Sequence, residues 1–114
     1  MSLIDKIRLA RQSCITIGGY AITIMRPTDL DAMEMQYASK KEAVLGVSKF
    51  VVDWKGFTEL DFYSGGTSDS VPFDQALFIE WIKDKPDLWG DLINGVMSAY
   101  KKHREKAGES SKNS

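Results

Sequence analysis

Apolar and polar residues alternate on both sides of a Gly-Gly dipeptide near the N-terminus, Gly18-Gly19. Both runs are rich in β-branched residues, which favour extended strands. A two-residue glycine turn between two such runs is typical of a β-hairpin. The pattern therefore predicts an antiparallel hairpin at about residues 14–25, with Ile17 opposite Tyr20.

The predicted register divides the hairpin into two faces. One face carries large apolar side chains: Ile15, Ile17, Tyr20, Ile22 and Ile24. The other face carries smaller ones: Cys14, Thr16, Ala21 and Thr23. A lone hairpin is barely stable in water, so we expect the large apolar face to pack on helices.

A short amphipathic pattern precedes the hairpin. Ser2 is a good N-cap for a helix over residues 2–11, in which Leu3 and Ile7 share a face. A helix of this length is marginal in isolation. We therefore expect it to dock on the rest of the molecule.

After the hairpin, apolar residues recur at the spacing of an α-helix. Thr28 and Asp31 resemble a capping box, which predicts a helix that begins at Asp29 and runs toward Ala43. Apolar residues three and four positions apart then predict a further helical segment over residues 41–54.

Gly46 lies inside this second segment. A glycine within a helical pattern indicates either a break between two helices or a close helix contact. The sequence leaves both interpretations open.

The stretch Val51–Trp89 contains all three tryptophans and four of the five phenylalanines. We expect its large rings to supply much of the core: Trp54, Phe57, Phe62, Phe73, Phe78, Trp81 and Trp89. Between the rings, residues 55–72 have the composition of an irregular, acidic, exposed loop.

Two helix starts follow the loop. Asp74 is a good N-cap for a helix with an apolar stripe of Leu77, Phe78, Trp81 and Ile82. Pro86 then suits the first position of a last helix, which should run to about Lys106 and end at Gly108. We expect residues 107–114 to form a disordered tail.

These elements predict one domain over residues 1–106 of the 114-residue chain. Its expected class is α+β, predominantly α-helical, with the N-terminal β-hairpin (about 14–25) packed on three to four helices. A single cysteine, no signal-peptide pattern and no apolar run of about 20 residues favour a cytoplasmic location.

Charge is segregated along the chain. Residues 1–49 carry seven Lys/Arg against five Asp/Glu, residues 50–93 carry three against nine, and residues 94–114 carry five against two. An acidic centre between basic ends is poorly suited to nucleic acid, which needs a positive face. The segregation favours contact between unlike patches, within one molecule or between copies.

No residue spacing indicates a catalytic or metal site, so we expect a non-enzymatic protein without cofactors. Cys14 and His103 are too few for zinc, although a Cys-His nucleophilic pair stays open. We expect the Cys14 thiol to be buried and inert, and His103 to lie in a solvent-facing turn. The acids of the loop lack the spacing of a calcium-binding EF-hand.

The candidate interaction surface combines acids with two adaptable methionines. Its residues are Glu59, Asp61, Asp69, Glu80, Asp84, Met33 and Met35. Paired acids such as Glu80 and Asp84 would perform acid–base chemistry only if burial raised the pKa of one carboxyl. Methionines at helical spacing are either a partner groove or ordinary core.

The order of these residues is itself distinctive. A Thr-capped helix follows the strand pair. Next come the motif Val-x-Asp-Trp-x-Gly-Phe-Thr-Glu (Val51, Asp53, Trp54 and Gly56–Glu59) and a Gly-Gly loop (Gly65 and Gly66). The motif Val-Pro-Phe-Asp (Val71–Asp74) follows the loop. Leu-Phe, Glu-Trp, Pro-Asp-Leu-Trp and Tyr-x-x-His follow: Leu77, Phe78, Glu80, Trp81, Pro86–Trp89, Tyr100 and His103. Over roughly residues 12–104 the chain resembles the small tail assembly chaperones of long-tailed, siphophage-type bacteriophages and their prophages.

The resemblance implies a mostly helical, non-enzymatic protein that is absent from the finished virion. Such proteins bind the tape measure protein and keep it soluble until tail tube subunits polymerise around it. They self-associate into spirals around this client, and in several phages a frameshifted C-terminal extension recruits the tail tube protein. The family supplies no catalytic residues. The charge distribution and the lack of a long apolar run, and not the resemblance, lead us to expect no nucleic-acid partner and no membrane partner.

Other classes of function stay open from the sequence. One is a structural virion protein, either a head–tail connector or a tail completion subunit. Another is a small enzyme that uses the acidic helix face of Glu80 and Asp84. An acidic decoy of DNA is disfavoured because the last helix is basic.

Overall fold

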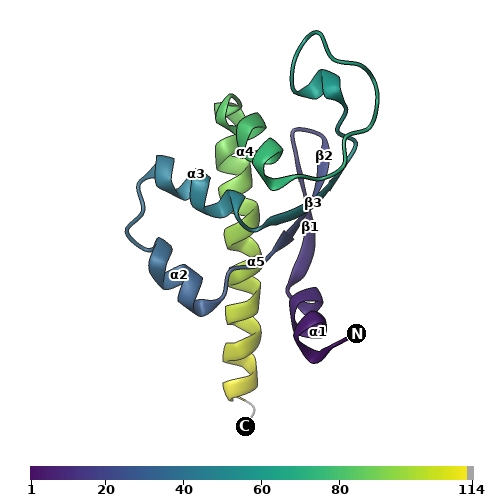
Figure 1. Cartoon of the computed structure of the whole chain (residues 1–114). Helices are drawn as coiled ribbons and strands as arrows, with labels where there is room; N and C mark the ends of the chain where they lie inside the picture. The colour runs from purple at the N-terminus through teal and green to yellow at the C-terminus, as the bar shows by residue number, and fades with distance from the viewer. Residues whose placement is uncertain (113–114) are drawn as a thin grey trace.

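The computed structural model describes the backbone of residues 1–112 and the side chains of residues 1–108. The elements run α1 (Leu3–Ala10), β1 (Gln12–Ile17), β2 (Tyr20–Met25), α2 (Asp29–Met35), α3 (Lys40–Ser48), β3 (Val51–Lys55), the 3₁₀ turn η1 (Glu59–Asp61), α4 (Gln75–Lys83) and α5 (Pro86–Lys112). Figure 1 shows the long α5 passing behind a small sheet. The predicted helix-dominated α+β class is confirmed, with a third strand in addition to the hairpin.

The hairpin forms in the predicted register. Ile17 pairs with Tyr20, and the antiparallel pairing continues to Gln12 opposite Met25. Gly18 and Gly19 adopt φ of 55° and 84°, the left-handed conformation that a tight hairpin turn needs and that other residues resist.

The segment expected to be the end of a helix is instead strand β3, which pairs antiparallel with β2. Val51 faces Ile24 and Trp54 faces Ile22, so four residues of β3 lie opposite three residues of β2 through a bulge. The extra residue puts Val51 and Trp54 on one face at a spacing of three, which imitates a helix. The bulge therefore explains why the periodicity predicted a helix wrongly.

The helix expected to run from Asp29 to Ala43 is also wrong, because α2 ends at Met35. Ser39 then caps α3, with its Oγ accepting a hydrogen bond of 3.2 Å from the Glu42 N–H. Gly46 lies within α3 and does not break it, and no atom lies within 4 Å of a Cβ built there. The break comes from a second N-cap and not from the glycine.

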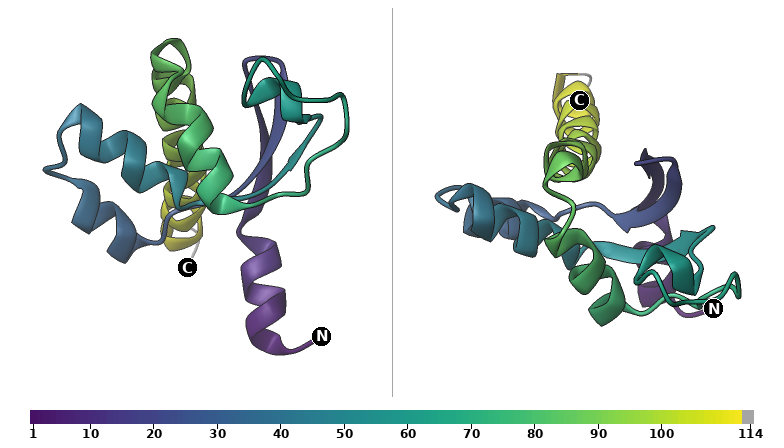
Figure 2. Two further views of the ribbon diagram at one scale, coloured as in Figure 1. Left: turned by 45° about the horizontal axis from the view of Figure 1, so that its top comes forward. Right: turned by 90° about the horizontal axis from the view of Figure 1, so that it is seen from above.

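The helix α5 runs antiparallel to β1. A Cβ at Gly18 would lie 2.9 Å from Leu88, and one at Gly95 would lie 2.8 Å from Ile15. Figure 2 shows α5 between the hairpin and the α2–α3 pair. The core forms where the sheet, α3, α4 and α5 meet, and its buried residues are Ile17, Ile22, Ile24, Val44, Val47, Val51, Trp54, Phe57, Phe78, Trp81, Ile82, Leu92 and Val96.

Two helical details differ from expectation. Leu77 is 37% exposed, although the other three residues of the predicted α4 stripe are buried. The helix α5 continues through Gly108 to Lys112, so the expected end at Gly108 is wrong. Residues 113–114 of the expected disordered tail lie outside the described residues.

A cluster of stacked rings joins the hairpin to α4. Tyr20 stacks on Phe57 with centroids 4.3 Å apart, Trp54 stacks on Phe57 at 4.4 Å, and Phe57 meets Trp81 edge-on at 4.9 Å. The indole N–H of Trp54 donates to the Val71 carbonyl oxygen at 2.8 Å, which satisfies the polar end of this buried ring. The main role of these aromatic residues is thus to pack the hairpin against α4 inside the fold.

Candidate functional site

Helix α1 is the least integrated element of the fold. Ser2 caps it as predicted, with Oγ accepting a hydrogen bond from the Asp5 N–H at 3.2 Å, yet no α1 residue is buried. Leu3 is 73% exposed and Ile4 is 51% exposed. Figures 1 and 2 show α1 projecting from the sheet beyond β1. The expectation that it docks on the rest of the molecule is therefore wrong for residues 1–112.

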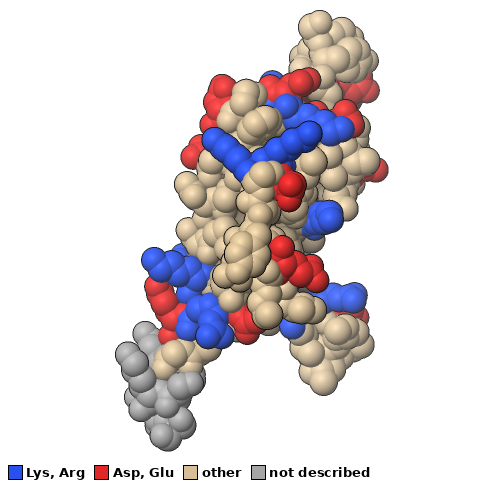
Figure 3. Space-filling view, turned by 90° about the vertical axis from the view of Figure 1, so that its left-hand side faces the viewer, with Lys and Arg blue, Asp and Glu red and all other residues tan. Residues whose placement is uncertain are grey.

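Exposed apolar side chains form a second surface on α2, α3 and the segment that connects them, on the side of the molecule that faces the viewer in Figure 3. Its exposed large side chains are Leu30, Met33, Tyr37 and Leu45. Met33 is 70% exposed, whereas Met35 packs against the core. Of the two candidate methionines, only Met33 is placed to meet a partner.

Asp61 was a candidate interaction residue, but its carboxylate makes hydrogen bonds within the fold. Its carboxylate accepts hydrogen bonds from the backbone N–H and the hydroxyl of Thr58, at 2.7 and 3.1 Å, and another from the Tyr20 hydroxyl. Burial alone would raise the pKa of Asp61, but these donors together lower it. Asp61 therefore fastens the loop to the hairpin.

Glu59 also holds the loop in shape. Its carboxylate accepts a hydrogen bond from the Thr67 N–H at 3.3 Å, and its N–H donates to the Asp69 carbonyl oxygen at 3.3 Å. A Cβ at Gly66 would lie 2.6 Å from the Glu59 carbonyl carbon, so only glycine fits that turn. Asp69 is exposed and its side chain is available to solvent.

The remaining two candidate acids lie on the exposed surface of α4. Glu80 forms a salt bridge of 2.9 Å with Lys83, and Asp84 is the C-cap residue of the helix. Both residues are exposed. Of the seven candidate residues, Met33, Asp69, Glu80 and Asp84 remain exposed.

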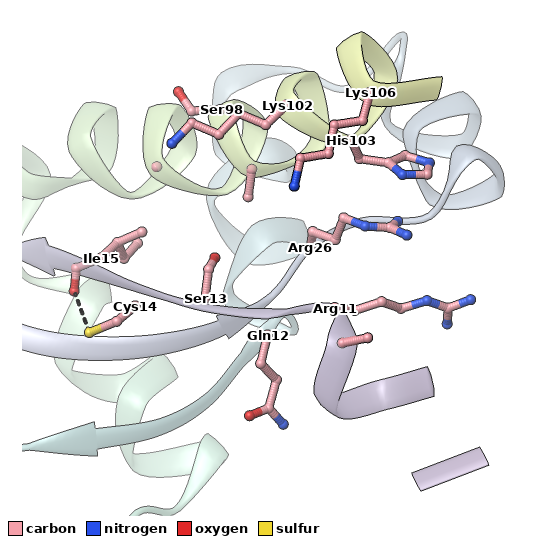
Figure 4. A pocket seen from close by; sticks show the side chains of 13 residues that line it. Arg11, Gln12, Ser13, Cys14, Ile15, Arg26, Ser98, Lys102, His103 and Lys106 are labelled. Carbon is pink, nitrogen blue, oxygen red and sulfur yellow. Dashed lines mark hydrogen bonds between the residues drawn. The ribbon is translucent and has the colours of Figure 1, made fainter. Parts of the chain in front are cut away.

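A groove between β1 and α5 was not anticipated. It has a volume of about 440 Å³ and is lined by Ala10, Arg11, Gln12, Ser13, Cys14, Ile15, Arg26, Gly95, Ser98, Ala99, Lys102, His103 and Lys106. Figure 4 shows cationic side chains on both walls: Arg11 and Arg26 on one, and Lys102 and Lys106 of α5 on the other. Because these residues come from opposite ends of the chain, no local sequence signal could have revealed the groove.

Cys14 and His103 both line this groove, yet the close-up view does not bring them together (Figure 4). The Cys14 thiol is exposed and donates weakly to the Ile15 carbonyl oxygen at 3.9 Å, so its predicted burial is wrong. His103 lies in α5 and not in a turn, with Nε2 3.9 Å from Asp29.

Asp29 joins α2 to α5. It accepts a hydrogen bond from the Tyr100 hydroxyl at 2.9 Å and lies 3.5 Å from the Arg104 guanidinium. The Tyr100 hydrogen bond is the main reason why the pKa of Asp29 is lowered, and the same bond raises the pKa of Tyr100. This acid neutralises part of the positive charge near the groove.

Among the described residues, no group of three or more His, Cys, Asp or Glu side chains is arranged to hold a metal ion. Within residues 1–112, no helix combines the length and the apolarity needed to cross a membrane. No protein family, no characterised protein and no solved structure matches the chain.

Proposed function

We propose that the protein is a non-enzymatic tail assembly chaperone of a long-tailed phage or prophage. In this proposal it binds the tape measure protein in the bacterial cytoplasm and assists assembly of the tail tube. Two features support it: the ordered aromatic, proline and glycine residues over roughly 12–104, and the unpartnered apolar face of α1.

The face of α1 is the observation that carries the proposal. Leu3, Ile4 and Ile7 lie on neighbouring turns and are 73%, 51% and 38% exposed. Full burial of a Leu or Ile side chain is favourable by about 1.5–3 kcal/mol, so leaving three exposed has a cost. Exposed apolar patches of this kind mark surfaces that a partner covers, and helical clients are recognised through such faces.

Co-purification with the tape measure protein of the same genome tests the proposal. We expect the wild-type chain to retain the client, and the double variant Ile4→Glu/Ile7→Glu to lose it. Both side chains are exposed in the free protein, so the variant should fold normally. Leu60→Glu is the matched control because Leu60 is 52% exposed but lies in η1, away from α1.

The alternative is a structural virion subunit, which would remain in the particle. Mass spectrometry of purified virions separates the two roles. A stoichiometric amount of the protein in virions, or retention of the client by the α1 variant, contradicts the proposal.

A further inference from the structure

We propose that the groove between β1 and α5 binds an acidic peptide segment of a partner protein. This inference rests on the groove alone and does not depend on the tape measure client. Ala10 is the one α1 residue among the described lining residues of the groove, and Leu3, Ile4 and Ile7 do not line it, so substitutions can test the two surfaces separately.

The charge of the groove is one-sided. Arg11 and Arg26 lie on the wall formed by the hairpin side, and Lys102 and Lys106 lie on α5. Among residues 1–108, whose side chains the structure describes, no aspartate or glutamate lines the groove. A concave site lined by one sign of charge concentrates the field and attracts the opposite charge.

These cations are free to receive a ligand. Among the described side chains, the salt bridges of the chain are Lys83 with Glu80 and Asp29 with His103 and Arg104, and none involves the four groove cations. Arg26 donates one hydrogen bond of 3.0 Å to the Pro27 carbonyl oxygen, which leaves other guanidinium donors unused. The charge of Arg26 helps to lower the pKa of Asp29, but this carboxylate already accepts a hydrogen bond from Tyr100 and pairs with Arg104.

The floor of the groove is small and largely uncharged. On α5, Gly95 has no side chain and Ser98 and Ala99 have short ones, and Ser13 and Cys14 of β1 line the other wall. The close approach of Gly95 to Ile15 narrows one end of the groove. The cations line the rest of it: the Lys102 side chain extends toward Ser98, whereas Arg11 and Arg26 extend toward the other end (Figure 4). A volume of about 440 Å³ lies in the usual range for sites that hold a small ligand or a short segment.

This combination favours a peptide over a nucleic acid. A nucleic acid needs a continuous basic track along its backbone, but here the four cations are confined to one groove of about 440 Å³ on a chain of net charge −1. A peptide with glutamate or aspartate residues among small side chains matches both parts of the groove. Arginine binds such carboxylates in paired, charge-assisted hydrogen bonds.

Fluorescence anisotropy with a labelled decapeptide of alternating Glu and Ala tests the inference in the full chain. At about 20 mM salt we expect binding to the wild type and at least about tenfold weaker binding to Lys102→Glu/Lys106→Glu. Lys55→Glu/Lys101→Glu is the matched control, because both lysines are exposed, neither lines the groove and net charge falls equally. We expect this control to stay within about twofold of the wild type.

Amide chemical shifts on peptide titration provide a second measurement and show where the peptide lies. We expect the largest shifts in β1 and in the α5 segment from Gly95 to Lys106. No binding to the wild type, equal weakening in both double variants, or shifts outside the groove would overturn the inference. Tighter binding of a ten-nucleotide single strand than of the peptide would also overturn it, in favour of nucleic acid.

Discussion

At the scale of single residues, the contact between Tyr20 and Asp61 ties the hairpin to the loop forty-one positions later. The hydrogen bond to Asp61 is the main reason why the pKa of Tyr20 rises from 10.0 to about 12. The folded state thus holds the tyrosine proton more tightly than the unfolded chain does. The stabilisation by Tyr20 is complete below pH 10.0 and disappears as the pH rises toward about 12.

The Tyr20→Phe variant removes this hydrogen bond and should lower the free energy of unfolding at pH 7 by about 1 kcal/mol. The loss of stability between pH 10.0 and about 12 should also become shallower than in the wild type. Urea denaturation across this pH range measures both effects. Tyr63→Phe is the control because Tyr63 is 59% exposed, and an equal effect of the control would contradict the role of Tyr20.

At the scale of elements, α1 and α4 begin with similar N-caps but differ in packing. Ser2 caps a helix with no buried residue, whereas Asp74 caps a helix that buries Phe78, Trp81 and Ile82. A cap contributes to global stability only when its helix unfolds together with the core.

We therefore expect Asp74→Ala to lower the free energy of unfolding by about 1 kcal/mol. Ser2→Ala should leave global unfolding unchanged and reduce only the helicity of α1. Urea denaturation measures the first effect, and hydrogen exchange of the α1 amides measures the second. Equal global destabilisation by both variants would mean that α1 docks on the domain in solution.

The glycines of α3 and of the loop provide a second comparison between elements. Gly46→Ala should stabilise the protein by up to about 1 kcal/mol, since α3 is continuous there and the added methyl group has free space. Gly66→Ala should destabilise it by about 1–3 kcal/mol, because its Cβ would collide with the Glu59 backbone. Thermal unfolding checks both signs, and a destabilising Gly46→Ala would contradict the free space at this position of α3.

At the scale of the whole molecule, the fold places the basic and the acidic parts of the sequence at opposite ends of an elongated shape. The basic ends of the sequence meet at the groove beside α1 and the second half of α5, while the acidic loop around η1 lies at the opposite end (Figure 1). The molecule is 58 Å long, several times the screening length at physiological salt. Opposite ends of two copies are therefore complementary, which suits head-to-tail contact.

Light scattering across a salt series tests this contact. We expect self-association at about 20 mM salt to weaken strongly by about 500 mM, because screening shortens the reach of exposed charges. Lys102→Glu/Lys106→Glu should weaken it at low salt as well. Assembly that is insensitive to salt would mean that apolar contacts hold the copies together.

Much of the fold was determined by local sequence. The glycine pair fixed the turn and register of the hairpin, Thr28 and Asp74 fixed two helix starts, and spaced rings identified most of the core. These features depend on short-range sterics and hydrogen bonds, which a few neighbouring residues specify. The same residues carry the resemblance on which the proposed function partly rests.

Tertiary structure alone decided the rest. Residues 51–55 became a strand because the open edge of β2 accepted it through a bulge, and Asp61 became a structural residue because Tyr20 reached it. The basic groove exists only because α5 lies antiparallel to β1, which brings Arg11 and Arg26 beside Lys102 and Lys106. Such features depend on contacts between distant segments, and no local window of sequence contains both partners.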